Sequence, residues 1–393
     1  MKKKTKQAGP AAWLRENKWT CAVLAAALVL LIVGRLLAAP ARVEAGQPEE
    51  RADYESAVVE QVLSDSTEKD PAADNGYRGE QLLLVTVKSG DYQGQQMQVY
   101  NYVGPLYGGP LHAGDRATIL ISSYSDGTVN ATVYEFDRLI PLAIVVALFI
   151  AAAVIVGGRT GAKSPVALAV PPVCLFGVLL PALMKGANTL LMTFIVCAYV
   201  AVVSLTIVGG VQKKSVCAML GAVAGTALAL LFGLLAQALT RVDGLRIEDV
   251  EPLLQLRQTG TPIGLRGLLV GGIIISALGA VMDVTMGIAS SLAEVHAANP
   301  QLSRRELFRS GMNIGRDMVG TMTNTLILAF LGSGFTLILY LYSLGLSFRQ
   351  LMSSAYVSME VVSGIASSVG VILSIPLTAL ITAAVFTREK QQS

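Results

Sequence analysis

The sequence predicts an α-helical polytopic membrane protein with about eight transmembrane helices and a small extracytoplasmic β-rich domain after the first helix. Of its 393 residues, 53% are hydrophobic and only 15% are charged. The mean hydropathy of +0.58 lies outside the range of soluble globular proteins. Apolar runs of about 20 residues, long enough to span a bilayer core, recur along the chain. One polar segment, residues 40–138, interrupts them.

The first predicted helix follows a basic N-terminus. A cleaved signal peptide is the alternative, because small residues follow the run at residues 37–41. A core of about 20 apolar residues is long for a signal peptide, so we favour a retained helix. The eight predicted helices cover residues 20–39, 139–157, 165–184, 189–209, 215–239, 267–291, 324–344 and 367–386.

Residues 40–138 are predicted to form the extracytoplasmic domain. The segment shows the two-residue alternation of half-buried strands, and turn residues separate its strand-like runs. Five short strands favour a small barrel or sandwich. The domain could bind a ligand, act as a spacer or dock a partner, and residues 64–78 are predicted as an exposed loop. The predicted strands cover residues 56–63, 82–88, 95–100, 116–121 and 129–136.

The remaining chain divides into three parts. Residues 139–239 are predicted to be a four-helix membrane scaffold, because their apolar runs contain no acid. Gly221 and Gly225 are four residues apart there, a spacing that lets helices approach closely. Residues 240–266 form an extracytoplasmic loop. Residues 267–393 form a three-helix region with polar stripes and a cytoplasmic amphipathic connector.

Basic residues predict the orientation in the cell membrane. Lys and Arg concentrate in cytoplasmic loops of membrane proteins. With the N-terminus inside, every inner segment of this chain is basic, so both termini are predicted to be cytoplasmic. The outer loop 240–266 contains four Arg, but four acids accompany them. The basic residues of the inner segments are Lys2, Lys3, Lys4, Lys6, Arg15, Lys18, Arg159, Lys163, Lys213, Lys214, Arg304, Arg305, Arg309, Arg316, Arg388 and Lys390.

The most informative single residue is Asp283, inside the apolar run 267–291. A carboxyl group at membrane depth costs several kcal/mol, about 3 on insertion scales, unless it faces a partner or a wet cavity. Asp283 therefore predicts a functional site. At 1.5 Å per residue it lies roughly 24 Å along its helix from Gly267, toward the inner leaflet.

Three polar stripes at helical spacing occur in the last third of the chain. The first is Asp283, Gly287, Ser290 and Glu294; the second is Asn313, Asp317, Thr321 and Asn324; the third is Glu360, Gly364 and Ser367, with Ser363 and Ser368 alongside. Each predicts a helix face directed at protein or water. The alternative is that these groups only hydrogen-bond helices together, and that Arg316 and Asp317 form a juxtamembrane ion pair. The predicted substrate or ion pathway comprises Asp283, Ser290, Ser291, Glu294, Asn313, Arg316, Asp317, Thr321, Asn324 and Glu360.

The expected depths of these acids differ. Asp317 is predicted to begin a helix from the inner side, and Glu360 to precede the last apolar run on the outer side, so the carboxylates are expected to be staggered across the membrane. Residues 350–386 are long for one crossing, which suggests a re-entrant piece around Glu360. Between the helices, Ser303 and Glu306 have capping-box spacing and open a short basic amphipathic helix on the inner surface.

The same region resembles a known family. Residues 278–294, Asn299 with Pro300, residues 310–317 and residues 320–328 are similar to the bacterial YibE/F family of multi-pass membrane proteins. The resemblance extends over nearly the whole chain, including the outer β-like segment. It implies a membrane transport protein without an assigned substrate and provides no active site to carry over.

Secondary transport or permeation is the leading functional hypothesis, with Asp283 as the main ligand for a proton, cation or polar substrate. The expected partners are the lipid bilayer and an unknown small solute or ion, with a possible homo-oligomer or membrane partner and no nucleic acid. A non-catalytic subunit or assembly factor that docks a partner through its outer domain is the alternative. An intramembrane aspartyl protease is only a minor alternative, because the Gly-x-Gly-Asp element that such proteases carry is absent around Asp283 and Asp317.

No enzyme chemistry, metal or cofactor is expected. The two histidines, His112 and His296, lie outside the apolar runs, which disfavours a Ser–His protease within the bilayer. The four cysteines lie inside predicted helices, at spacings that suit neither a metal site nor a disulfide framework.

Overall fold

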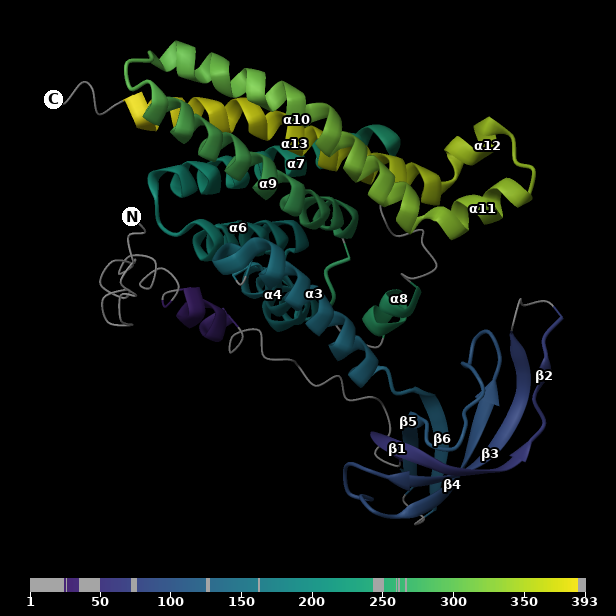
Figure 1. Ribbon diagram of the computed structural model, residues 1–393. Helices are drawn as coiled ribbons and strands as arrows, with labels where there is room; N and C mark the ends of the chain where they lie inside the picture. The colour runs from purple at the N-terminus through teal and green to yellow at the C-terminus, as the bar shows by residue number, and fades with distance from the viewer. Residues whose placement is uncertain are drawn as a thin grey trace, which may run out of the picture. The chain divides into compact units, whose positions relative to one another are not determined.

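The computed structural model describes residues 25, 27–34, 50–71, 76–124, 128–161, 163–242, 251–258, 260, 262–265 and 267–387 (Figure 1). The chain forms two compact units. One comprises Glu44–Ala152 and the other comprises Met1–Val43 with Ala153–Ser393. The first unit contains a β-barrel and the second a helical bundle.

The barrel is a closed ring of five strands with a sixth at its edge. β1 pairs with both β5 and β3, β3 with β4, and β6 with β5, all antiparallel, while β4 and β6 are parallel neighbours. This strand order matches that of OB-fold barrels. β2 only extends the edge of β3. The strands are β1 (Glu50–Asp65), β2 (Glu68–Lys69), β3 (Tyr77–Val87), β4 (Gln96–Val103), β5 (Arg116–Tyr124) and β6 (Val129–Phe136).

Alternating side chains fill the barrel. Along β3, residues 81, 83, 85 and 87 are buried and the residues between them are not, and Leu83, Ile119 and Ile121 are fully enclosed. All five predicted strands are therefore confirmed, and the barrel alternative is the one observed. The segment predicted as a loop at residues 64–78 includes the end of β1 and the short β2.

The helical part of the chain begins directly after the barrel. Only two residues separate the end of β6 from α3. The helices are α3 (Leu139–Gly161), α4 (Ser164–Cys174), a π-helical turn (Leu175–Leu179), α5 (Leu180–Met184), α6 (Thr189–Gly209), α7 (Lys213–Thr240), α8 (Glu251–Gln258), α9 (Leu268–Ala298), α10 (Arg304–Ser333), α11 (Phe335–Ser343), α12 (Phe348–Ser353) and α13 (Ala355–Thr387).

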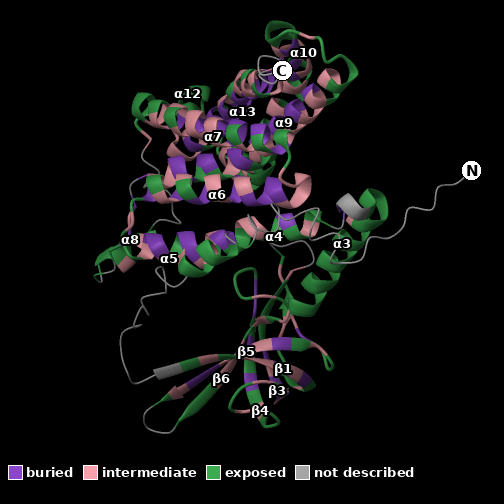
Figure 2. Cartoon of the chain, turned by 90° about the vertical axis from the view of Figure 1, so that its left-hand side faces the viewer, coloured by how far each residue is buried: buried purple, intermediate pink, exposed green. Residues whose placement is uncertain are grey.

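The core of the bundle is formed by α7, α9 and α13, which pack against one another along their lengths. Small residues allow this close approach. A Cβ atom on Gly225 would lie 2.6 Å from Cβ of Ser374, and one on Gly370 would lie 2.6 Å from Cβ of Ala229. The predicted packing role of Gly225 is confirmed, and its partner is α13. Buried residues concentrate in these helices, whereas α3 is exposed (Figure 2).

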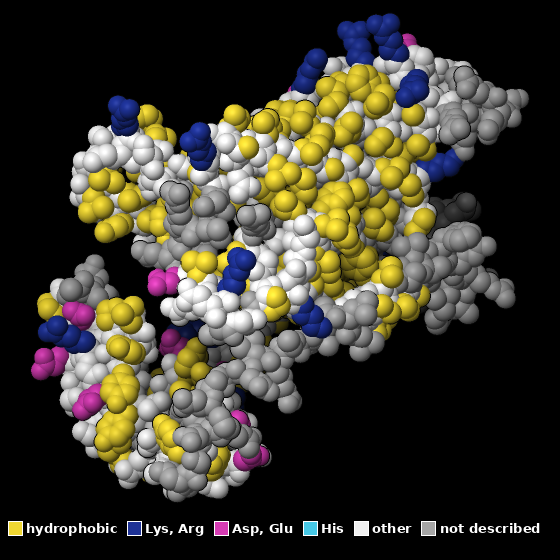
Figure 3. All heavy atoms as spheres, turned by 180° about the vertical axis from the view of Figure 1, so that it is seen from behind, with side chains coloured by type: hydrophobic (Ala, Val, Ile, Leu, Met, Phe, Trp, Pro, Cys, Tyr) yellow, Lys and Arg dark blue, Asp and Glu magenta, His cyan; other side chains and the backbone are white. Residues whose placement is uncertain are grey.

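Six described helices are long and apolar enough to cross a membrane, or up to seven if the bent pair α10 and α11 counts as one span. The predicted number of eight is not reproduced. The first predicted helix, residues 20–39, lies mainly outside the described residues; its described part, residues 25 and 27–34, is helical. α4, the π-helical turn and α5 together form one span, Ser164–Met184. Hydrophobic side chains cover much of the bundle face seen in Figure 3.

Two local expectations are corrected, and one is confirmed. The basic connector is not a separate surface helix, because α10 continues unbroken from Arg304 to Ser333. Its capping box is confirmed: the Glu306 N–H donates to Ser303 Oγ at 3.3 Å, and the Ser303 N–H donates to Glu306 Oε2 at 2.8 Å. Glu360 lies inside the continuous helix α13 rather than in a re-entrant piece. The break occurs instead between α10 and α11, where the chain bends by 61°.

Candidate functional site

Asp283 lies at the midpoint of α9, with 15 residues of that helix on each side. The neighbouring Val281 and Val284 are buried in the bundle core, whereas Asp283 is exposed on the opposite side of the helix. The helix is continuous here because its apolar core face packs in the bundle, which outweighs the modest helix propensity of the Val, Thr and Gly residues around Asp283. Asp283 is therefore held on a rigid element at mid-length. Its predicted distance along the helix from Gly267 is unchanged, and α9 continues seven residues beyond the predicted end at residue 291.

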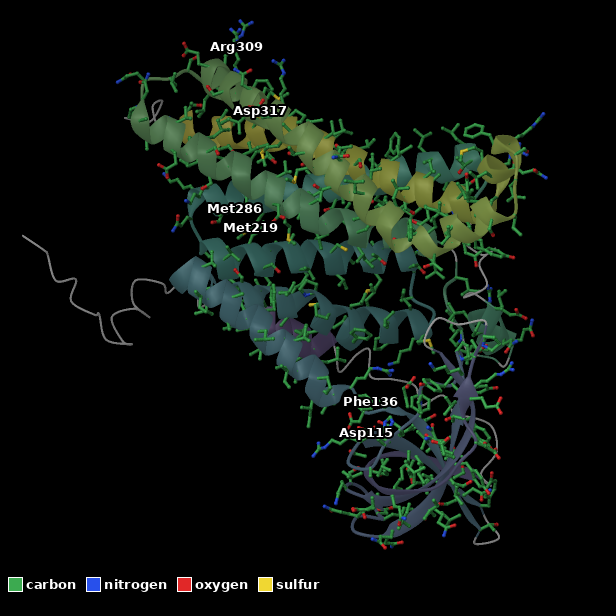
Figure 4. The ribbon with its side chains drawn as sticks, turned by 45° about the vertical axis from the view of Figure 1, so that its right-hand side comes forward. Asp115, Phe136, Met219, Met286, Arg309 and Asp317 are labelled. Carbon is green, nitrogen blue, oxygen red and sulfur yellow. The ribbon has the colours of Figure 1, made fainter. Side chains whose placement is uncertain are left out.

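The exposed side of α9 lies between α6 and α10 (Figure 1). On the α6 side, a Cβ atom on Gly209 would lie 2.8 Å from Cε of Met286. On the α10 side, a Cβ atom on Gly287 would lie 3.1 Å from Cε of Met318. Figure 4 labels Met286 on α9, with Asp317 and Arg309 on α10. We call this strip the α9 face. It comprises Gly272, Gly279, Asp283, Ser290 and Glu294.

No hydrogen bond or ion pair reaches the carboxylate of Asp283 within the described part of the chain. One helical turn before it on the α9 face is Gly279, which carries no side chain, and one turn after it is Gly287, against which Met318 of α10 packs. No heavy atom lies within 4 Å of the position that a Cβ on Gly279 would occupy. The carboxylate is thus accessible and unshielded, which is an expensive arrangement at membrane depth.

A lysine side chain lies near the C-terminal end of the α9 face. Lys214 Nζ, from the start of α7, donates to Ser290 Oγ at 3.3 Å. Glu294 follows one turn further along α9 and is exposed, while Ser291 is half-buried. The sequence analysis did not include Lys214 in the site. Its position at the boundary of an apolar run is the signal that could have identified it.

The second polar stripe lies on the outer side of α10. The opposite side of α10 packs into the bundle through Gly311 and Gly315, where a Cβ on Gly311 would lie 2.8 Å from Cβ of Ala379. The hydroxyl group of Thr321 donates a hydrogen bond to the Met318 carbonyl at 3.1 Å. We call this stripe the α10 face. Its five residues are all exposed: Asn313, Arg316, Asp317, Thr321 and Asn324.

The two faces lie at corresponding levels of the bundle. α9 and α10 run antiparallel, with Gly287 against Met318 and Ile288 near Gly315. Asp283 is therefore at the level of the turn that follows Asp317. The structure thus places these two acids at similar depths, where the sequence suggested a stagger. No hydrogen bond or ion pair joins them among the described residues.

Glu360 is separated from both faces. It lies near the start of α13, beside a cavity of about 290 Å³ between α10, α11 and α13, whose lining is otherwise without charged side chains. Ser276 of α9 and Ser367 of α13 are hydrogen-bonded at 2.9 Å. Asp283 lies seven residues after Ser276 on α9, and Glu360 lies seven residues before Ser367 on α13. The two acids are therefore on opposite sides of the serine pair, and their positions along the bundle differ by about 20 Å.

Several hydroxyl groups of the third stripe have a structural role. Ser367 also donates to the Ile273 carbonyl at 3.3 Å, and Ser368 to the Gly364 carbonyl at 2.8 Å. These bonds satisfy buried polar atoms within and between helices, as the alternative interpretation of the stripes proposed. Among the described residues, no group of three or more His, Cys, Asp or Glu could hold a metal ion.

Comparison with known protein families matches residues 145–388 to the family described as YibE/F-like protein. No curated protein and no solved structure matches the chain. The matched segment contains both polar faces and begins after the barrel, so the match supports the resemblance for the membrane helices and does not extend it to the β-domain. Because the match covers more than half of the sequence, the chain belongs to the YibE/F-like protein family.

Proposed function

We propose that the chain is a secondary transporter or permease in which the α9 and α10 faces line a pathway for a proton, cation or small polar solute. One observation carries the proposal: an accessible, unpartnered carboxylate, Asp283, at the midpoint of a helix long enough to span a membrane. A carboxylate that can exchange protons or bind a cation is the usual means of coupling in such proteins.

The arrangement of small and polar groups fits this role. Gly279 leaves space on one side of Asp283 among the described residues, so that an ion or solute can reach the carboxylate from that side. Ser290 and Lys214 form a polar contact two turns further along α9, and Glu294 lies near its end. A series of exchangeable groups along one helix can pass a ligand from the bilayer centre toward one surface.

A pathway on these faces requires a cover, because lipid tails cannot solvate Asp283, Asn313 or Asp317. The long helix α3 offers no suitable side chain, since residues 139–158 contain no polar side chain. We propose that a second copy of the chain covers the faces. The α10 face is self-complementary: Arg316 and Asp317 are neighbours, so each copy can offer the other an opposite charge at the same depth.

The proposed location is the cell membrane, with the N- and C-termini in the cytoplasm. The six apolar helices fit a multi-pass membrane protein. The basic segments between predicted helices support the orientation through the excess of Lys and Arg in cytoplasmic loops.

Flux through proteoliposomes tests the function. The purified protein would be reconstituted with a trapped pH-sensitive dye, and proton movement would be followed while monovalent cations, divalent cations and amino acids are added in turn. We expect at least one of these additions to drive proton movement across the vesicle membrane. We also expect a protonophore to change the rate or extent of that movement. Asp283→Asn should abolish it, and Asp283→Glu should retain part of it, because only the second keeps an ionisable group.

Glu251→Gln is the matched control, since it neutralises an acid of α8 outside both faces. It should leave the flux unchanged. Folding of each variant would be checked by its thermal midpoint. The proposal would be abandoned if Asp283→Asn transported as well as the unmodified protein. It would also fail if no probe moved faster than in empty vesicles while a stoichiometric protein partner co-purified.

A further inference from the structure

The barrel, which the proposed function does not use, presents a cluster of exposed tyrosines. Eight of the 12 tyrosines in the chain lie in residues 50–138. Five of them form one region on the outer wall of the barrel, each between 47% and 65% exposed. We call this region the tyrosine surface. It consists of Tyr54 on β1, Tyr134 on β6, Tyr100 and Tyr102 on β4, and Tyr107 in the turn after β4.

The rings are arranged in contact with one another. The centroids of Tyr54 and Tyr134 are 5.0 Å apart with the planes at 82°. Tyr102 lies 6.4 Å from Tyr100, nearly parallel to it at 17°, and 6.4 Å from Tyr107. These separations are typical of favourable aromatic pairs. The rings therefore form ordered pairs rather than isolated surface residues.

Strand pairing joins the two groups of rings into one surface. Tyr54 is opposite Leu120, Leu120 is opposite Thr132, and Thr132 is opposite Tyr100, so one outward row crosses four strands. The next outward positions on the parallel neighbours β4 and β6 are Tyr102 and Tyr134. Successive outward side chains thus belong to adjacent strands, and the surface is continuous.

The support beneath the surface is rigid. The carbonyl of Gly104 accepts hydrogen bonds from the N–H groups of Tyr107 at 3.0 Å and Gly108 at 2.9 Å, which fixes the turn that carries Tyr107. Inside the barrel, buried Asn101 donates to Gln81 Oε1 at 3.0 Å. Gln81 in turn accepts from the Leu111 N–H at 2.9 Å. Because these bonds fix the backbone that carries the rings before any ligand arrives, less backbone entropy is lost on binding.

Charge limits the class of ligand. Residues 50–138 contain 14 Asp and Glu but only six Lys and Arg. Acids also border the rings: Glu80 is directly opposite Tyr102 on β3, and a Cβ on Gly108 would lie 2.8 Å from Oε1 of Glu135. Acidic side chains are interspersed over the face of the barrel seen in Figure 3. A polyanion such as a nucleic acid or an anionic lipid surface would be repelled.

We propose that the tyrosine surface binds a glycan chain built of neutral or amino sugars. The C–H face of a pyranose ring stacks on a flat aromatic ring, and its hydroxyl groups donate to a carboxylate such as that of Glu80, which is opposite Tyr102. Tyrosine supplies both a flat apolar face and a polar rim.

Binding of defined oligosaccharides to the full chain tests this inference. The protein in phosphatidylcholine nanodiscs would be titrated calorimetrically with chitohexaose and cellohexaose. We expect saturable binding of at least one of them. The double variant Tyr100→Ala/Tyr102→Ala should weaken it by about tenfold or more, the size expected when stacked aromatic rings are removed. The double variant Tyr100→Phe/Tyr102→Phe should stay close to the unmodified affinity, because the rings remain.

Tyr77→Ala is the matched control. Tyr77 is also exposed and on the barrel, but it makes no ring contact with the tyrosine surface. This variant should bind as the unmodified protein does. Absence of binding to both oligosaccharides would overturn the inference, as would equal losses in the control and in the alanine double variant. Tyrosine-dependent binding to phosphatidylglycerol vesicles in place of glycan would overturn it as well, by showing a membrane contact.

Discussion

Asp283 illustrates how much depends on the immediate neighbours of one residue. A carboxylate flanked on its face by bulky apolar side chains would be shielded from any ligand. Here one residue a turn away is Gly279, beside which the described residues leave open space, so the carboxylate is open on that side to whatever covers α9. The sequence identified Asp283 by composition alone, because an acid inside an apolar run is rare. It could not indicate that the acid points away from the bundle core, since that depends on which side of α9 packs against α7 and α13.

Asp65 provides a prediction at the same scale. Its carboxylate accepts hydrogen bonds from Thr67 Oγ1 at 2.7 Å, from the Thr67 N–H at 2.9 Å and from Gln81 Nε2 at 2.9 Å. These bonds, the one from the Thr67 hydroxyl above all, lower the pKa of Asp65 below its ordinary value of 3.8. A lowered folded-state pKa stabilises the fold above the unfolded pKa, and the stabilisation is lost as the pH falls through the lowered value.

We therefore expect the barrel to lose stability as the pH falls below that ordinary value, and Asp65→Asn to reduce this loss. Near-UV circular dichroism of the tyrosines, followed during heating at neutral and acid pH, measures this loss of stability in both proteins. At neutral pH the variant should melt slightly below the unmodified protein, because an amide accepts these hydrogen bonds less strongly. Asp91→Asn, in the turn before β4, is the control. An unchanged acid dependence in Asp65→Asn would contradict the argument.

At the scale of elements, periodicity was enough to locate strands and spans but not their partners. The five strands appear where two-residue alternation predicted them. Closure of the barrel could not be predicted from the sequence, because it depends on one long strand. β1 has 16 residues, and its first half pairs with β5 while its second half pairs with β3. The break in pairing register between Val59 and Gln61 bends β1 at that change. Such long-range pairing leaves no local pattern.

The helical bundle shows the same limit. The spacing of Gly221 and Gly225 predicted a close helix approach, and the structure shows that α13 is the partner. The bend between α10 and α11 was missed because the apolar run continues through Gly332 and Gly334 without a charged break. The continuity of α10 was missed because its first turns are polar, and they were assigned to a connector. In both cases tertiary packing decides the boundary.

The contact between α7 and α13 gives a prediction for these elements. In Gly370→Val the new side chain would collide with Ala229, whose Cβ lies 2.6 Å from the position of a Cβ on residue 370. Overpacking of this kind destabilises by about 1–3 kcal/mol. We expect a lower thermal midpoint in detergent. Gly177→Val is the control, because no heavy atom lies within 4 Å of a Cβ there. Equal midpoints for the two variants would show that α7 and α13 are not held this closely.

At the scale of the whole molecule, two surfaces remain without a partner, and they differ in chemistry. The tyrosine surface is rigid and acidic, and suits a hydroxyl-rich ligand. The α9 and α10 faces belong to helices long enough to span a membrane, and they bear carboxylates, amides and a guanidinium group. Water can satisfy the first surface in the absence of a ligand, but lipid cannot satisfy the second. The family match covers only the second, so the family is defined by the apolar helices and not by the barrel.

A second copy is the simplest cover for the α9 and α10 faces, and substitution of Gly279 separates this idea from a monomeric arrangement. Within one chain, no heavy atom lies within 4 Å of a Cβ at Gly279. A phenylalanine there should leave the fold of each chain and its thermal midpoint unchanged. It should nevertheless prevent two copies from approaching along α9, since a glycine in a helix–helix contact allows a separation that a large ring does not.

We therefore expect single-molecule photobleaching of the labelled protein in lipid vesicles to show mostly two bleaching steps per particle. Gly279→Phe should shift the distribution to mostly one. Gly177→Phe, which also enters open space but lies away from both faces, should keep two. If the unmodified protein bleaches in one step, the acids of these faces are covered by something other than a second copy. If Gly279→Phe remains dimeric, the two copies meet elsewhere, and Asp283 then needs a different partner from the one proposed.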